Sequence, residues 1–143
     1  MSPEEFAERA TSLRAPRYKR WASGWDACDC YGLIVLYWRE VLGRELLPEP
    51  ALASGMADGF SALGMHWDLA PPTPGACGFM AWEGELPRHC GVLLPRGDLL
   101  HTEPPSPVGA GGPRATRLTA LARLYPDVRF YAPRPSAFSE NSA

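Results

Sequence analysis

The sequence predicts an α+β fold in which helices come first and an antiparallel sheet follows. In the N-terminal half, Leu33, Leu36 and Tyr37 recur at the spacing of one helix face. From Gly78 onward, short apolar segments alternate with short turns, which is typical of consecutive antiparallel strands. Helices and strands separated in this way favour α+β over a βαβ architecture.

The expected elements form a single domain over residues 1–143. Ser2 is the expected N-cap of the first helix, within residues 1–14, and Phe6, Ala10 and Leu13 form its buried face. Residues 15–27, 46–50 and 104–113 are expected to be a connecting loop, an extended linker and a flexible Pro/Gly loop, and 134–143 a polar tail. Helices are expected at 2–13, 31–42, 51–63 and 118–124, and strands at 65–69, 79–82, 88–94, 98–102 and 128–131.

Composition excludes several classes of partner. The chain has 14 basic and 16 acidic residues and a net charge of −2, so we expect no binding to nucleic acid or to anionic membranes. No apolar segment has the length of a membrane span, and none of the signal-peptide type stands near Met1, so synthesis in the cytoplasm without a signal peptide is expected. The four cysteines are too poorly spaced for a disulfide framework, and we expect free thiols.

Asp29 and Cys30 stand directly before the apolar helix predicted at 31–42. Asp29 is a suitable N-cap, since its carboxylate can accept from the backbone N–H groups of the first turn. Cys30 would then lie at the positive end of the helix dipole, where a thiolate is favoured. Two interpretations follow: Cys30 is a nucleophile, or it is a small buried apolar residue.

His89 and His101 stand on two predicted strands joined by the turn at residues 95–97. A hairpin centred on Pro95 places the two imidazoles opposite each other on one face. One ring can then accept the thiol proton of Cys30 while the other orients it, which is the arrangement of nucleophile, base and orienting residue in acyl-transfer enzymes. His66, between Met65 and Trp67, is interpreted as a structural residue at a strand edge.

Zinc binding is the alternative that the same residue types allow. Cys28, Cys30, His89 and His101 are all possible zinc ligands, and two histidines across a hairpin can hold a metal. The Cys-x-Cys spacing is tighter than that of most zinc sites, so no metal or cofactor is expected.

The segment Asp29-Cys30-Tyr31-Gly32-Leu33 resembles the nucleophile motif of the NlpC-type cell-wall peptidases, a family of small papain-like cysteine peptidases. His89-Cys90-Gly91-Val92, followed by Leu100-His101-Thr102, resembles the histidine strand of that family and the next strand, which bears its third polar residue. The resemblance extends over about residues 17–131. It departs from the family at 75–79, where the usual Gly-Asp is absent.

The resemblance implies a papain-like fold, with the nucleophile helix packed on an antiparallel sheet, and a role for each site residue. Cys30 would be the nucleophile, His89 the general base and His101 the orienting residue. Tyr18, twelve residues before Cys30, and Asp29 would belong to the oxyanion- and substrate-binding part.

The resemblance also implies a substrate and a setting. The substrate would be a peptidoglycan stem peptide, cut at the γ-D-glutamyl-diamino acid bond through a thioester. The form of the motif is most similar to peptidases of phage tails and of tail-like gene transfer agents, so other tail proteins are the expected partners. A tail plug or assembly protein of the same fold, with little or no catalysis, is the alternative from another functional class.

Overall fold

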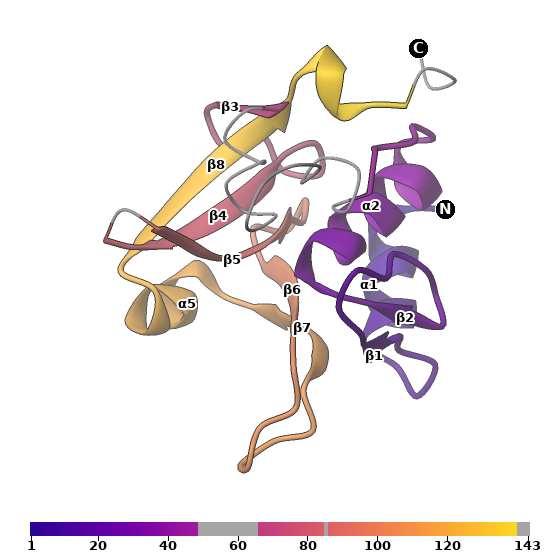
Figure 1. Ribbon diagram of the computed structural model, residues 1–143, viewed down its shortest axis with the longest axis vertical. Coiled ribbons are helices and arrows are strands. Elements are labelled where there is room, and N and C mark those ends of the chain that lie inside the picture. Colours follow the sequence, from indigo (N-terminus) through magenta and orange to yellow (C-terminus); the bar gives the residue numbers. More distant parts are fainter. Residues whose placement is uncertain (49–65, 85, 140–143) are drawn as a thin grey trace.

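The computed structural model has a mixed α+β architecture built on an antiparallel sheet of six strands (Figure 1). It describes residues 1–48, 66–84 and 86–139. The strand order is β3-β8-β4-β5-β6-β7, with a separate parallel pair formed by β1 and β2. The elements are α1 (Pro3–Ala10), β1 (Arg17–Tyr18), β2 (Ala27–Cys28), α2 (Cys30–Val41), β3 (Trp67–Leu69), β4 (Gly78–Glu83), β5 (Leu86–Leu93), β6 (Leu99–Glu103), β7 (Gly112–Thr116), α5 (Leu118–Leu124), β8 (Asp127–Pro133) and a 3-10 turn at Pro135–Ala137. None of the helices within these ranges is long and apolar enough to cross a bilayer.

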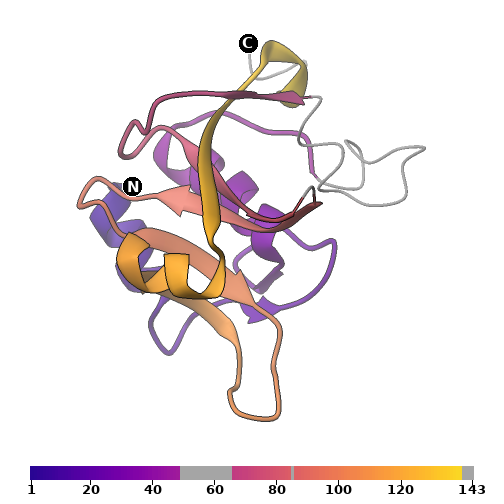
Figure 2. The ribbon, with the colours of Figure 1, turned by 90° about the vertical axis from the view of Figure 1, so that its left-hand side faces the viewer.

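Two apolar clusters hold helices against the sheet. Figure 2 shows α5 in front of the strands and α2 behind them. Every residue of α2 from Cys30 to Trp38 is buried, so this helix is an interior element. The cluster around α2 includes Phe6, Leu33, Tyr37, Met80, Cys90, Val92 and Leu100. The second cluster, which includes a residue of α5, consists of Cys77, Phe79, Ala81, Leu93, Leu99 and Leu121.

The helix predictions are confirmed in the described part of the chain, with one correction. Ser2 and Glu5 form a reciprocal capping box at α1, and Phe6 and Ala10 are fully buried. The expected burial of Leu13 is wrong: α1 ends at Ala10 and the Leu13 side chain is fully exposed. The predictions at 31–42 and 118–124 correspond to α2 and α5. The helix predicted at 51–63 lies outside the described residues.

The strand predictions are confirmed for β3, β4, β5, β6 and β8, but three strands were missed. β1 lies within the loop predicted at 15–27, and β2 begins at its last residue. β7 overlaps the end of the loop predicted at 104–113 and continues to Thr116. β7 has the sequence Gly-Pro-Arg-Ala-Thr, which lacks the apolar alternation of a half-buried strand. Among the described strands it pairs with β6 alone, and proline is tolerated at such an edge. The polar tail is also corrected, because Ala137 is buried and Phe138 bridges to Leu46.

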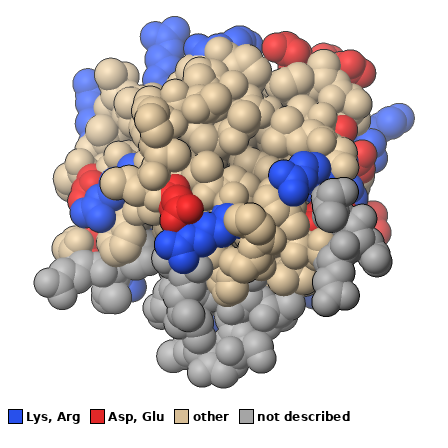
Figure 3. Space-filling view, turned by 90° about the horizontal axis from the view of Figure 1, so that it is seen from above, with Lys and Arg blue, Asp and Glu red and all other residues tan. Residues whose placement is uncertain are grey.

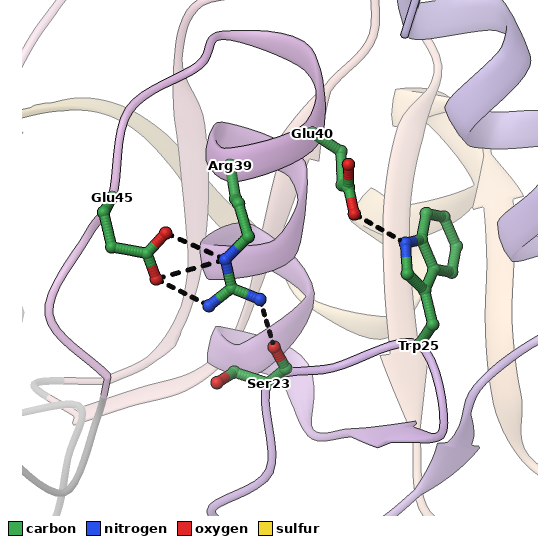
Figure 4. Close-up of polar contacts among 5 residues, drawn as sticks. All are labelled: Ser23, Trp25, Arg39, Glu40 and Glu45. Atoms are coloured by element: carbon green, nitrogen blue, oxygen red, sulfur yellow. Dashed lines mark hydrogen bonds and ion pairs between the residues drawn. The ribbon is translucent and has the colours of Figure 1, made fainter.

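Hydrogen bonds connect the loop before α2 to the C-terminal half of that helix (Figure 4). The indole Nε1 of Trp25 donates to Glu40 Oε1 at 2.8 Å. The Arg39 guanidinium donates to both carboxylate oxygens of Glu45 and, at 3.3 Å, to the Ser23 carbonyl oxygen. These contacts fix the path of the chain that leads into the first turn of α2.

Candidate active site

Cys30 occupies the first position of α2, and the predicted N-cap is confirmed. Asp29 Oδ1 accepts from the Gly32 N–H at 2.7 Å, and Asp29 Oδ2 accepts from the Trp21 N–H at 2.8 Å. Trp21 has a φ of 71°, so the carboxylate holds a residue in the left-handed region. Asp29 therefore joins the preceding loop to the helix terminus that presents Cys30.

The close approach of the preceding loop to the first turn of α2 explains why position 32 is a glycine. A Cβ at Gly32 would overlap the carbonyl oxygen of Ala22, which crosses the first turn of α2. That carbonyl accepts from the Asp29 N–H at 3.1 Å. Only a residue without a side chain allows the loop to cross this close to the helix.

We expect Asp29→Ala to lower the free energy of unfolding by about 2 kcal/mol or more, since a buried carboxylate with two amide partners is removed. Ser2→Ala is the matched control, because it removes the exposed cap of α1 and should cost about 1 kcal/mol. Urea denaturation of both variants measures the difference. A smaller loss for Asp29→Ala than for Ser2→Ala would contradict this role.

His89 on β5 and His101 on β6 form a buried, directly hydrogen-bonded pair. His89 is 4% exposed and His101 is 0% exposed. His89 Nε2 lies 2.7 Å from His101 Nδ1. The other nitrogen of His101, Nε2, lies 2.7 Å from Thr116 Oγ1 on β7. The predicted pairing of the two imidazoles is thus confirmed. The Thr116 hydroxyl, on the unpredicted strand β7, adds a third member to this hydrogen-bonded series.

The centre of the hairpin differs from the prediction by one residue, which shifts the pairing by two. Val92 pairs with Leu100 and Leu93 with Leu99, which centres the hairpin on Arg96 and sets His101 across from Gly91. His89 is therefore the diagonal neighbour of His101 on the same face. A Cβ at Gly91 would overlap the Leu100 carbonyl oxygen and lie 2.6 Å from the Phe79 ring and 3.0 Å from His101 Cβ. Gly91 leaves the space that the His101 side chain needs.

We expect Gly91→Ala to separate β5 from β6 and to lower the free energy of unfolding by about 1–3 kcal/mol through overpacking. Gly24→Ala is the control, because a Cβ there meets no atom within 4 Å. Chemical denaturation of the two variants tests this. Equal stability of the two variants would show that the close approach at Gly91 is not needed.

Burial keeps both imidazoles in the neutral form near neutral pH. It lowers the pKa of His89 to about 3, with a further contribution from His101, and it lowers the pKa of His101 to about 4 against the opposing effect of Glu103. Glu103 Oε1 lies 3.4 Å from His101 Nδ1 and 2.9 Å from the Arg114 guanidinium. A neutral ring with a free lone pair is the form that can accept a proton.

Two aromatic rings, from Phe79 and Tyr125, enclose the histidine pair. Phe79 meets both imidazoles edge-on, and Tyr125 stacks on His89 with ring centroids 5.3 Å apart. Burial, then the charges of Glu103 and Cys30, raise the pKa of Tyr125.

Cys30 and the histidine pair lie on elements that pack against each other. Cys30 belongs to the apolar cluster around α2, and α2 packs on β5 and β6. Among the described residues, no hydrogen bond joins its Sγ to His89. The structure brings His89 and His101 together, and proton transfer from Cys30 to His89 stays a prediction.

Tyr18 lies on β1, paired in register with Cys28, two residues before Cys30. It lines a groove of about 550 Å³ between this segment and the base of the β6–β7 hairpin, where Pro105 and Gly111 form the opposite wall. Figures 1 and 2 show that this hairpin extends away from the sheet. The predicted place of Tyr18 at an oxyanion site stays a prediction.

The possible metal ligands differ from the predicted set. His89, His101 and Glu103 each offer one ligand atom, and these atoms lie within 4.8 Å of one another. All four cysteines are free and buried, as expected for thiols, and none belongs to this group.

Sequence reasoning missed three neighbours of the site: Thr116, Tyr125 and Arg114. None of them stands in a motif with the histidines. The only available signal was the order of elements, which brings the segment after the 104–113 loop back to β6.

No protein-family model matches the chain, and no curated protein or solved structure matches it. On the face in Figure 3, charges of both signs are scattered over a largely uncharged surface.

Proposed function

We propose that this chain is a cysteine peptidase with a small papain-like fold of the NlpC type. The observation that carries the proposal is the buried pair His89–His101 and its extension to Thr116, joined by two contacts of 2.7 Å, beside a helix that begins at Cys30. A nucleophile, a base and an orienting group in this order are the requirements of acyl transfer through a thioester.

In the proposed mechanism, each ring nitrogen of His89 and His101 has its own role in proton transfer or orientation. If Thr116 Oγ1 accepts from His101 Nε2–H, then His101 Nδ1 accepts from His89 Nε2–H, and Nδ1 of His89 keeps its lone pair. That nitrogen takes the thiol proton of Cys30, and the sulfur attacks the carbonyl carbon of the scissile amide. His89 then returns the proton to the leaving amine, and water hydrolyses the thioester.

The absence of a direct bond between the thiol and His89 is compatible with these roles. Catalytic hydrogen bonds are often long in a protein without substrate and shorten in the Michaelis complex. The backbone N–H of Cys30, in the first turn of α2, is the proposed donor to the oxyanion, with the Tyr18 hydroxyl as the second donor.

The proposed substrate is the peptidoglycan stem peptide, at the γ-D-glutamyl-diamino acid bond, on the basis of the motif resemblance. Purified peptidoglycan is incubated with the protein, and the soluble fragments are identified by liquid chromatography and mass spectrometry. We expect fragments ending in D-glutamate and a matching set with a new amino group on the diamino acid. Fragments from cleaved glycan strands, or no fragments beyond those of the heat-denatured protein, would overturn the proposal.

The proposed setting is a phage tail or a tail-like particle of a bacterium, where local opening of the cell wall accompanies genome entry. This rests on the form of the motif around Cys30. If the protein assembles with tail proteins but releases no fragments, the alternative of a tail plug or assembly protein is the correct one.

A further inference from the structure

We propose that His89, His101 and Glu103 form a Zn²⁺ site that, when filled, switches the histidine pair out of its catalytic form. Three possible ligand atoms converge here: His89 Nε2, His101 Nδ1 and Glu103 Oε1. In the neutral pair a single proton lies between the two nitrogens. A cation that accepts all three lone pairs is therefore the natural substitute for that proton.

The three ligand atoms lie within 4.8 Å of one another and have to rearrange to hold zinc. The two nitrogens are 2.7 Å apart, and His101 Nδ1 is 3.4 Å from Glu103 Oε1. Ligands at about 2.0–2.2 Å from a tetrahedral ion lie about 3.3–3.5 Å from one another, so the two nitrogens need to separate by roughly 0.6–0.8 Å. Two histidines and one glutamate, with a fourth position left for water, is a known zinc ligand set.

Glu103 provides the route by which an ion reaches the buried nitrogens. Its side chain is 31% exposed, and it pairs with Arg114, which is 55% exposed, at 2.9 Å. An exposed ion pair of this kind contributes little to stability and exchanges readily. Zn²⁺ would displace Arg114 from the carboxylate and then meet His101.

Zn²⁺ bound at this site would change the tautomer of His89. In the catalytic form described above, the His89 proton is on Nε2 and the lone pair is on Nδ1. A metal at Nε2 requires the proton on Nδ1, which is the nitrogen that would receive the thiol proton. No proton is lost from either ring: His101 keeps its own on Nε2, toward Thr116. Inhibition therefore rests on the proposed peptidase function, whereas metal binding does not.

The test measures metal binding first and hydrolysis second. The full-length protein is titrated with Co²⁺ and Zn²⁺, following Co²⁺ by its visible absorption and Zn²⁺ by calorimetry. Glu103→Gln removes the charged ligand at a partly exposed position, and His101→Gln removes a nitrogen ligand. Glu45→Gln is the matched control, since it removes a carboxylate paired with Arg39 away from this group.

One ion per chain is expected, with binding weakened at least about tenfold in Glu103→Gln and unchanged in Glu45→Gln. His101→Gln should bind as weakly as Glu103→Gln if circular dichroism shows that it is folded. Stoichiometric Zn²⁺ should then stop peptidoglycan hydrolysis, and a chelator should restore it.

Absence of Co²⁺ binding, binding unaffected by Glu103→Gln, or the near-ultraviolet absorption of a cysteine–cobalt bond would overturn the site. Metal binding with undiminished hydrolysis would overturn the switch alone, and metal binding by a protein without any hydrolysis would overturn the proposed function but not the site.

Discussion

Cys30→Ala is expected to abolish the release of stem-peptide fragments, with a loss of at least about 10³-fold in turnover. The alanine side chain offers no electron pair for attack, and no other cysteine stands at a helix N-terminus in the described part of the chain. The fold should persist, because Cys30 Sγ makes no hydrogen bond there and the substitution removes only one buried sulfur. Fragment release per unit time, measured beside the wild-type protein, gives the result.

Cys77→Ala is the control for the loss of a buried thiol. Cys77 belongs to the second apolar cluster and accepts from the Thr73 N–H at 3.2 Å. This variant should hydrolyse peptidoglycan like the wild-type protein. Substantial hydrolysis by folded Cys30→Ala would exclude the thioester mechanism.

His89→Gln is expected to reduce turnover by about 10²–10⁴-fold, the usual contribution of a general base. His101→Gln should cost less, because the glutamine amide oxygen can still accept from His89 Nε2–H. His101→Leu should fall between the two, since it leaves the buried His89 nitrogen without a partner. The rates of the three variants, each checked for folding by circular dichroism, establish the order.

A different order would change the assignment of roles. If His101→Gln costs as much as His89→Gln, then His101 takes part in proton transfer and does not only orient its neighbour. If neither substitution slows hydrolysis, the pair is a structural element of the β5–β6 hairpin.

The parts of the site that the sequence predicts are local in the chain. The helix start at Asp29 follows from its capping preference and from the apolar spacing behind it. The shared face of His89 and His101 follows from the two-residue period of strands. It is kept when the hairpin centre moves from Pro95 to Arg96, because that move shifts the pairing by two residues.

The parts that the sequence did not predict depend on contacts between distant segments. Thr116 lies on an edge strand whose residues show no apolar alternation, so neither the strand nor its hydroxyl was expected. Tyr125 follows α5 and reaches His89 only because β8 returns to the middle of the sheet, between β3 and β4. Leu13 is the opposite case: its spacing fits a buried face, but the helix ends three residues earlier.

The reactivity of Cys30 tests the central claim without any assumption about substrate. Cys30 is 8% exposed, whereas Cys28, Cys77 and Cys90 are at most 1% exposed. Burial, with the charges of Asp29 and Cys30, also raises the pKa of the Cys28 thiol to about 12. The folded protein is treated with iodoacetamide at about pH 6, where ordinary thiols react slowly, and the rate at each cysteine is read by peptide mass spectrometry.

We predict that Cys30 is modified at least about tenfold faster than the other three cysteines, and that His89→Gln removes most of this difference. The second part excludes exposure alone as the cause, because the substitution leaves Cys30 at the same position on α2. Modification of Cys30 at the rate of the buried thiols, or an undiminished rate in His89→Gln, would contradict the proposal that His89 activates Cys30.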